Sequence, residues 1–165
     1  MFRGLPVTRN HTGLVLFLEE DHFLGPDFLH LLSLMTRHKQ ELGVDILSLG
    51  TYLGRTVSSR RETAEVMDWV SSKHNMGMAL TRVEWEKILS CSEEFCQFDD
   101  YNWDWSLQHV SDHCLSEPLT VLVIKQPRVF HIGECGLHHK KSNCDPAAAL
   151  DRVKSIIQET VPAST

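Results

Sequence analysis

Two short apolar runs on either side of an amphipathic segment constrain the fold of this chain more than any other feature. The first run covers Leu14–Leu18 and the second, VDILSLG, covers residues 44–50. Between them, Pro26 and Asp27 mark a helix start, and apolar residues recur at helical spacing until Gly43. Continuous apolar runs are typical of strands covered on both faces. Strand, helix and strand at this spacing predict a βαβ unit with a right-handed crossover, and therefore an α/β fold.

The remaining segments add further elements to this unit. We expect residues 1–12 to be irregular, and residues 51–73, which are rich in serine and arginine, to be loop with a little helix. Helices are predicted from Arg82 or Val83, over residues 99–115 (DDYNWDWSLQHVSDHCL), and over residues 146–161, where Asp145-Pro146 is a start signal. A strand is predicted in LTVLVIKQPRVFHIG, residues 119–133, which Pro127 interrupts or ends.

Charge and cysteine content narrow the class of protein. The 165 residues are enough for one globular domain, and a net charge of −6 argues against nonspecific nucleic-acid binding. No stretch approaches the roughly 20 apolar residues of a membrane span, and the start of the chain has no signal-peptide pattern. The five cysteines all lie in the second half, and an odd count leaves one thiol over in an oxidised protein. Together these features indicate a fragment of a longer, oxidised protein.

Three acids, Glu19, Glu20 and Asp21, directly follow the first apolar run and precede a histidine. Ligands of open α/β sheets bind beyond the carboxyl ends of the strands. Carboxylates at that place suit a hard divalent cation, which takes oxygen ligands and bridges to phosphate. The alternative is a solvated turn whose charges point outward.

A second cluster, FHIGECGLHHKKSNC, contains His131, Cys135, His138, His139 and Cys144. Its composition suggests zinc and a zinc-binding interaction module, but the paired C-x2-C spacing of common structural sites is absent. A disulfide between the two cysteines would compete for the same thiolates.

The segment DDYNWDW, residues 99–105, interleaves three aspartates with three aromatic rings. Rings beside carboxylates are typical of sugar-binding sites. If the helix includes this segment, Asp104 shares a face with Asp100, Tyr101 and Gln108. The alternative is a core helix with acids at its N-terminus, where they favour the helix dipole.

Five strings taken together resemble one family closely: LFLEEDH, LSLGTY, HNMGMALTR, CSEEFCQFDDYNWDW and FHIGECGLHHKK. They resemble the N-acetylglucosaminyltransferase II family, the alpha-1,6-mannosyl-glycoprotein 2-beta-N-acetylglucosaminyltransferases, in order from about Gly13 to Cys144. The resemblance implies a GT-A-type glycosyltransferase fold and inverting transfer of N-acetylglucosamine from UDP-GlcNAc. The acceptor would be the mannose on the α1,6 arm of an N-glycan, in β1,2 linkage.

The resemblance also implies roles for single residues. Asp21 looks like the last acid of the family's metal-binding motif, and His131 like the second protein ligand of Mn²⁺. Asp104 resembles the catalytic base that takes the proton from the mannose 2-hydroxyl. These implied roles replace zinc with manganese.

Further implied roles concern substrate contacts and disulfides. Substrate-binding roles are implied for Arg55, Asn75, Tyr101 and Trp103. Disulfides are implied between Cys91 and Cys114 and between Cys135 and Cys144, whereas Cys96 would pair with a cysteine beyond this chain.

The family carries a membrane anchor, a stem and the first part of the nucleotide-binding sheet before the acidic strand, and acts in the Golgi lumen. Residues 1–165 would then be a single partial GT-A domain, with an irregular segment at 1–12 and a helix and tail at 146–165. Most uridine and ribose contacts would lie outside it, so the isolated fragment is expected to lack half of the donor site. The alternative reading is a noncatalytic glycan-binding remnant of the same fold.

Overall fold

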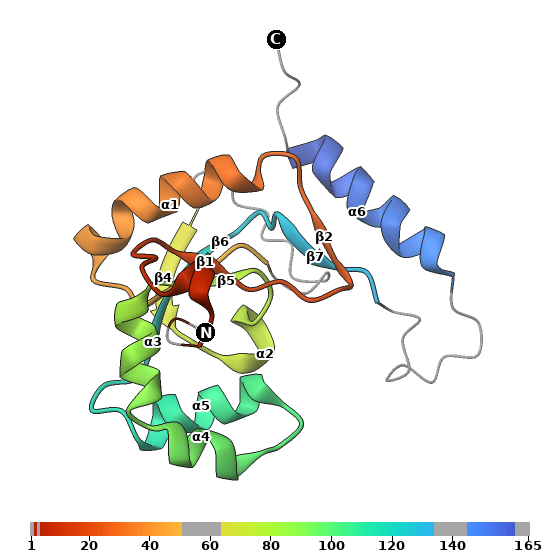
Figure 1. Cartoon of the computed structure of the whole chain (residues 1–165). Helices are drawn as coiled ribbons and strands as arrows, with labels where there is room; N and C mark the ends of the chain where they lie inside the picture. Colours follow the sequence, from red (N-terminus) through yellow and green to blue (C-terminus); the bar gives the residue numbers. More distant parts are fainter. Residues whose placement is uncertain (1, 3, 51–63, 134–144, 161–165) are drawn as a thin grey trace.

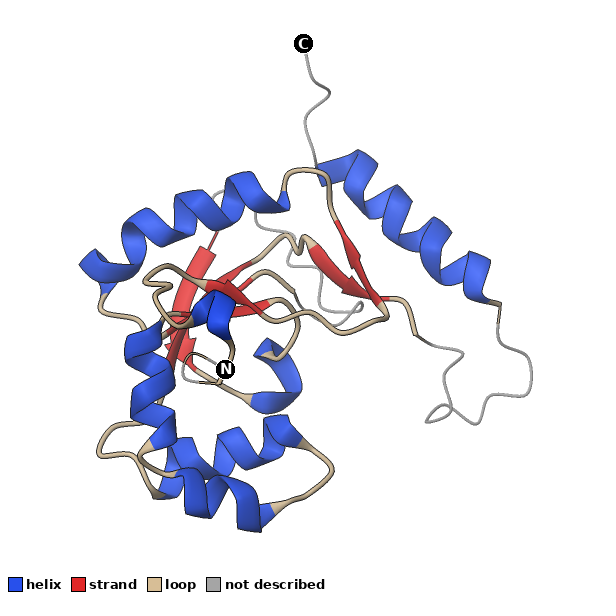
Figure 2. Ribbon diagram, in the orientation of Figure 1, coloured by secondary structure: helices blue, strands red, loops and turns tan. Residues whose placement is uncertain are grey.

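The computed structural model describes residues 2, 4–50, 64–133 and 145–160, and its elements follow one another as a mixed α/β chain (Figures 1 and 2). In chain order they are a 3-10 turn η1 (Pro6–Thr8), β1 (Val15–Leu16), β2 (His22–Leu24), α1 (Phe28–Leu42), β3 (Ile46–Ser48), β4 (Ala64–Asp68), α2 (Ser71–His74), β5 (Met78–Leu80), α3 (Arg82–Leu89), α4 (Ser92–Phe98), α5 (Trp103–His113), β6 (Thr120–Ile124), β7 (Val129–His131) and α6 (Pro146–Thr160).

The main layer is a five-stranded mixed sheet in the order β1-β5-β3-β6-β4. β3 and β6 are parallel, and the other neighbouring strands are antiparallel. A second, two-stranded sheet pairs β2 with β7 in antiparallel fashion. The α/β class expected from the sequence is therefore confirmed, with a sheet that mixes strand directions.

Helices cover both faces of the main sheet. Figure 1 shows α1 across one face and α3, α4 and α5 gathered on the opposite side. Side chains alternate between the two faces along a strand. In β3, Ile46 packs into the core on the α3–α5 side with Leu107, whereas Leu47 packs into the core on the α1 side with Met35. Each buried strand thus contributes to two cores, as its continuous apolar sequence predicts.

The strand–helix–strand prediction is correct in its elements but incomplete in its pairing. β1 spans two residues and is half-buried at the edge of the described sheet, and Leu18 is 44% exposed. β5 lies between β1 and β3 and is antiparallel to both. The run Leu14–Leu18 is therefore not a long buried strand, because its edge position leaves β1 with a single neighbour. Helix α1 ends where expected, at Gly43, whose φ of 66° is left-handed.

Two other segments differ from expectation. Part of residues 51–73, expected to be loop, is strand β4, because its backbone pairs with β6 along five residues. The helix expected to include residues 99–102 begins at Trp103 instead. Pro127 does interrupt the apolar run 119–133, since β6 and β7 lie in different sheets. Within the described residues, no helix combines the length and apolarity that a membrane span requires.

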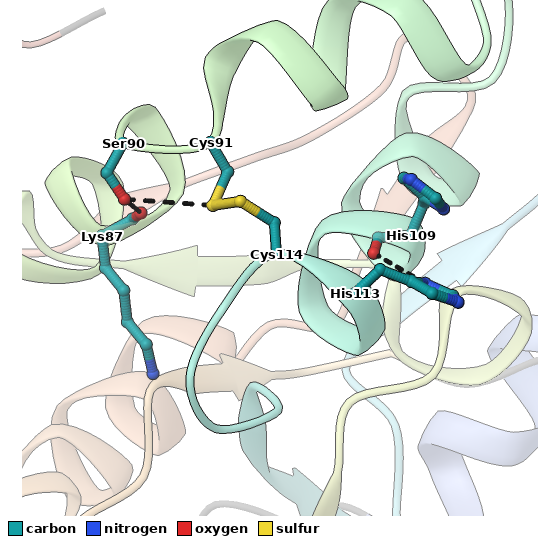
Figure 3. Close-up of a disulfide and its surroundings, with 6 residues drawn as sticks. All are labelled: Lys87, Ser90, Cys91, His109, His113 and Cys114. Atoms are coloured by element: carbon teal, nitrogen blue, oxygen red, sulfur yellow. Dashed lines mark hydrogen bonds between the residues drawn. A yellow bond between two sulfur atoms is a disulfide. The ribbon is translucent and has the colours of Figure 1, made fainter.

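A disulfide joins Cys91, directly before α4, to Cys114, directly after α5 (Figure 3). It confirms the pairing that the resemblance implied. Cys96 is free and exposed. The cross-link closes the α4–α5 hairpin, whose connecting loop carries residues 99–102, the first four of the DDYNWDW segment. Within α5, the rings of His109 and His113 stack on each other with their centroids 4.6 Å apart.

Candidate functional site

Pairing of β2 with β7 brings the two predicted metal ligands together. The acids follow β1, and Asp21 immediately precedes β2, while His131 is the last residue of β7. In the register of this pair, His22 lies opposite His131. The Oδ2 atom of Asp21 is 3.1 Å from Nε2 of His131. Two residues 110 positions apart in the printed sequence therefore share one end of a small sheet.

The Asp21 carboxylate has one oxygen whose hydrogen-bonding capacity is not satisfied by the described residues. Its Oδ1 atom is buried and receives no hydrogen bond from the described residues. A buried carboxylate oxygen without a partner is costly, and a metal ion is one way to satisfy it. Gly133 lies directly against the other oxygen, where a Cβ atom would clash with Oδ2. Gly133 thus leaves room for the Asp21 side chain, and aspartate with histidine is a donor set that fits a divalent cation.

His22 extends this cluster, and the sequence did not single it out as a ligand. Ligand atoms of Glu19, Asp21 and His22 lie within 4.8 Å of one another. The His22 side chain is almost fully buried, and burial lowers its pKa although the nearby carboxylates of Glu19 and Asp21 oppose this. A neutral imidazole is the form that coordinates metals. In the sequence, only the position of His22 directly after three acids could have indicated a ligand. The β2–β7 pairing is what places His22 opposite His131.

The DDYNWDW segment separates into a loop and a helix start. Asp99 holds the loop: its Oδ1 accepts hydrogen bonds from the backbone N–H groups of Tyr101 and Asn102, and its Oδ2 accepts one from the Asn102 amide. These bonds hold the pKa of Asp99 below its ordinary value. Asp99 is thus a turn-forming residue of the loop before α5, and not an acid at the N-terminus of a core helix as the structural alternative had it.

Asp104 lies in the first turn of α5, where the helix dipole favours a negative side chain. Its half-buried carboxylate accepts hydrogen bonds from Ser71 and Asn75 of the α2 region, at 2.8 and 3.0 Å from Oδ2. Asn75, predicted to bind substrate, therefore contacts the predicted base directly. Ser71 was not predicted, and nothing in its sequence context distinguishes it from the neighbouring Ser72.

A cavity of about 310 Å³ links the acidic segment to the α5 region. Its polar lining comes from Glu19 and His22 on one side and from Asn75 and Trp103 on the other. The indole Nε1 of Trp103 donates a hydrogen bond to Glu19 Oε1 at 3.3 Å. The rest of the lining is apolar and comes mainly from β5, α3, α4 and α5: Phe17, Leu18, Met78, Leu80, Trp85, Ile88, Phe95 and Leu107.

The other predicted site residues divide into two groups. Tyr101 is 67% exposed in the loop before α5 and does not line this cavity. Arg55 lies outside the described residues, and so do Cys135 and Cys144 with their predicted disulfide. The structure thus brings Asp21 close to His131, and Asp104 close to Asn75. Neighbours of both pairs line the same cavity.

Comparison with known proteins gives a consistent result. The family described as N-acetylglucosaminyltransferase II (MGAT2) matches residues 1–163. A rat relative (Rattus norvegicus) named alpha-1,6-mannosyl-glycoprotein 2-beta-N-acetylglucosaminyltransferase is 46% identical over 160 residues, which cover 95% of this chain and 36% of the relative. Proteins of the same name from Homo sapiens and Arabidopsis thaliana are 45% identical over 160 residues and 34% identical over 140 residues. The human match covers 95% of this chain and 36% of the relative; the plant match covers 85% and 32%. The chain spans about a third of the length of these relatives.

Proposed function

Because this chain belongs to the N-acetylglucosaminyltransferase II family, we propose that it forms part of the catalytic domain of an inverting glycosyltransferase. The proposed reaction moves N-acetylglucosamine from UDP-GlcNAc in β1,2 linkage to the mannose of the α1,6 arm of an N-glycan. We propose that residues 1–165 are one partial GT-A domain of a membrane-anchored protein of the Golgi lumen. The mixed sheet covered by helices on both faces is compatible with that fold.

One observation carries the proposal: the acidic segment and the Asp104 region converge on a single cavity. Glu19 and His22 line it from the β1–β2 side, and Asn75, which donates to Asp104, lines it from the other. A transferase needs a cation site for the diphosphate and a base for the acceptor hydroxyl within one substrate length. Asp21, His131 and Asp104 do not themselves line the cavity, but Glu19, His22 and Asn75, which lie beside them, do. This supports a shared site for the cation and the base.

Asp104 is the proposed base. In a single displacement, its carboxylate takes the proton of the acceptor 2-hydroxyl while that oxygen forms a bond to the anomeric carbon of the donor. The bond from this carbon to the diphosphate oxygen breaks, UDP leaves, and the configuration inverts. Trp103 and Asn75, which both line the cavity, are the proposed contacts to a sugar beside this carboxylate.

Asp21 and His131 are the proposed holders of Mn²⁺, with Glu19 and His22 close enough to orient or join them. Bound there, the ion would neutralise negative charge on the leaving diphosphate. The unsatisfied Oδ1 of Asp21 and the carboxylate–imidazole donor set support this assignment.

Substitution of Asp104 tests the proposal. Transfer from UDP-GlcNAc to a mannose-terminated acceptor is measured with Mn²⁺, in the full-length polypeptide that carries this sequence. Asp104→Asn keeps the size and the hydrogen-bond acceptor but removes the base, so turnover is expected to fall by about 100-fold or more while UDP-GlcNAc still binds.

Asp100→Asn is the matched control, because Asp100 is an exposed acid of the same segment. It should retain turnover within about 2-fold, as exposed substitutions away from the chemistry do. The alternative, a noncatalytic glycan-binding remnant, predicts acceptor binding without transfer in the unsubstituted protein. Turnover that survives Asp104→Asn would remove Asp104 as the base.

A further inference from the structure

We propose that Ser71 is a positioning residue for the transfer reaction, which fixes the Asp104 carboxylate so that the acceptor proton arrives on Oδ1. The inference rests on the function proposed above. It follows from the two hydrogen bonds that converge on one oxygen of this carboxylate. Ser71 Oγ lies 2.8 Å and Asn75 Nδ2 lies 3.0 Å from the same Oδ2 atom of Asp104.

Both donors come from one short element, four residues apart. A hydroxyl and an amide that donate to the same oxygen leave it little capacity for anything else. An amide nitrogen can only donate, so the oxygen it contacts has to be the unprotonated one. The proton taken from a substrate hydroxyl therefore goes to Oδ1. In the described part of the chain, Oδ1 accepts only the backbone N–H of Trp105, at 3.0 Å.

The Ser71 hydroxyl is itself held in place. Ser71 is fully buried, and its backbone N–H donates to Gln108 Oε1 at 2.9 Å. Gln108 lies one turn after Asp104 on α5, and its amide nitrogen donates to both oxygens of Asp112. Residues 104, 108 and 112 thus lie along one face of α5. Ser71 at the start of α2 donates hydrogen bonds to the first two of them.

His74 stabilises α2 from within. Its Nδ1 accepts the backbone N–H of Val70 at 2.9 Å, which closes the turn that presents Ser71 and Asn75 to the carboxylate. Burial lowers the pKa of His74 to about 4, and the neighbouring Lys73 charge adds to this effect. The ring is therefore neutral at physiological pH and remains an acceptor. A buried hydroxyl on a short helix that is bonded to α5 and closed by its own histidine is suited to orienting a base rather than binding a substrate.

Steady-state kinetics of Ser71→Ala in the full-length polypeptide test this role. Loss of one hydrogen bond to a charged group predicts a fall in kcat of about 10- to 100-fold. KM for UDP-GlcNAc and for the acceptor should stay within about 2-fold, because the residue acts through Asp104 and touches neither. Ser71→Thr, which restores the hydroxyl, should recover most of the lost kcat.

Two further variants keep the test decisive. Ser72→Ala removes the exposed neighbouring serine of the same helix and should leave kcat unchanged. Ser71→Cys, whose thiol fills the same buried space but is only a weak donor, decides the question if Ser71→Ala does not fold, with the same expected fall in kcat.

The outcomes separate this inference from the proposed function. A kcat within 2-fold of the unsubstituted protein in Ser71→Ala, or in Ser71→Cys where it is the deciding variant, overturns the positioning role, provided that Asp104→Asn is inactive. A rise in KM that accounts for the whole loss also overturns it. Full activity of Asp104→Asn would contradict the proposed base, and the positioning role with it.

Discussion

Two aspartates of the DDYNWDW segment, Asp99 and Asp104, have different environments that the sequence alone does not distinguish. Asp99 accepts three hydrogen bonds within its own loop and forms a turn. Asp104, five positions later, accepts the local N–H of Trp105 on Oδ1, but its Oδ2 accepts from the distant α2 region. A carboxylate that accepts only from local N–H groups stabilises its own turn. Bonds from a remote buried hydroxyl instead fix the orientation of a carboxylate relative to another element. Contacts, not residue type, therefore separate the two roles.

The buried imidazole of His74 gives a prediction about pH. Its pKa of about 4 in the folded protein lies below the ordinary 6.5, so the unfolded chain binds the proton first on acidification. The stability that this residue contributes is complete above pH 6.5, is lost progressively down to about pH 4, and changes no further below that. The loss over this window should reach about 3 kcal/mol. Urea unfolding at pH 7.0 and 4.5 measures it.

His74→Asn is the informative variant, because its Oδ1 can replace Nδ1 as acceptor of the Val70 N–H but does not titrate in this range. It should be less sensitive to acid than the unsubstituted chain. His30→Asn, at an exposed position of α1, is the control and should keep the original sensitivity. Equal sensitivity of all three proteins would show that His74 does not carry the effect.

At the scale of elements, one buried ion pair ties the helix on one face of the sheet to a helix on the other. Lys39 of α1 donates to Glu84 of α3 at 2.7 Å and to the backbone oxygen of Val44 at 2.9 Å. Glu84 also accepts from Thr81, which completes the capping box of α3. Burial alone would raise the pKa of Glu84, but the bonds from Lys39 and Thr81 outweigh it and lower that pKa.

Removal of one partner from this pair should be severe. Lys39→Met leaves the Glu84 carboxylate buried without its counter-charge, and is expected to reduce the free energy of unfolding by about 3–5 kcal/mol at pH 7. Urea denaturation checks the value. Lys154→Met, in an exposed pair with Asp151, is the control and should change stability by less than about 1 kcal/mol. Similar losses in both variants would mean that burial does not amplify the Lys39 contact.

Elements defined by local signals were predictable, and those defined by remote pairing were not. Gly43 ends α1 and Pro127 separates β6 from β7, because both residues act on their own backbone. β4 was missed, since its sequence AEVMD is only half-buried and its strand conformation depends on pairing with residues 120–124. The disulfide and the site residues came from resemblance to a family, not from periodicity.

For the candidate site, the residue types were predictable but their contacts were not. The acids of the EEDH string mark a cation site by their position after an apolar run. That His22 lies opposite His131, and that Ser71 contacts Asp104, depends on elements that are distant in sequence. No local pattern encodes such contacts, because they arise when the β2–β7 pair and the α2–α5 contact form.

At the scale of the whole molecule, the candidate cation site joins two segments that are distant in the chain, since Asp21 precedes β2 and His131 is the last residue of β7. A ligand that binds only the folded state stabilises the entire chain. Mn²⁺ is therefore expected to raise the melting temperature of the 165-residue chain. At about 100-fold excess over its Kd the gain is about 2.7 kcal/mol, or several degrees.

Asp21→Asn should abolish this increase, because it removes the carboxylate whose Oδ1 is buried without a hydrogen bond from the described residues. Asp151→Asn, an exposed acid of α6, is the matched control and should respond to Mn²⁺ like the unsubstituted chain. Thermal denaturation with and without Mn²⁺, and again after addition of EDTA, needs no substrate and no turnover. An increase that persists in Asp21→Asn would place the ion elsewhere, and no increase in any variant would mean that these ligands do not hold Mn²⁺ in this chain.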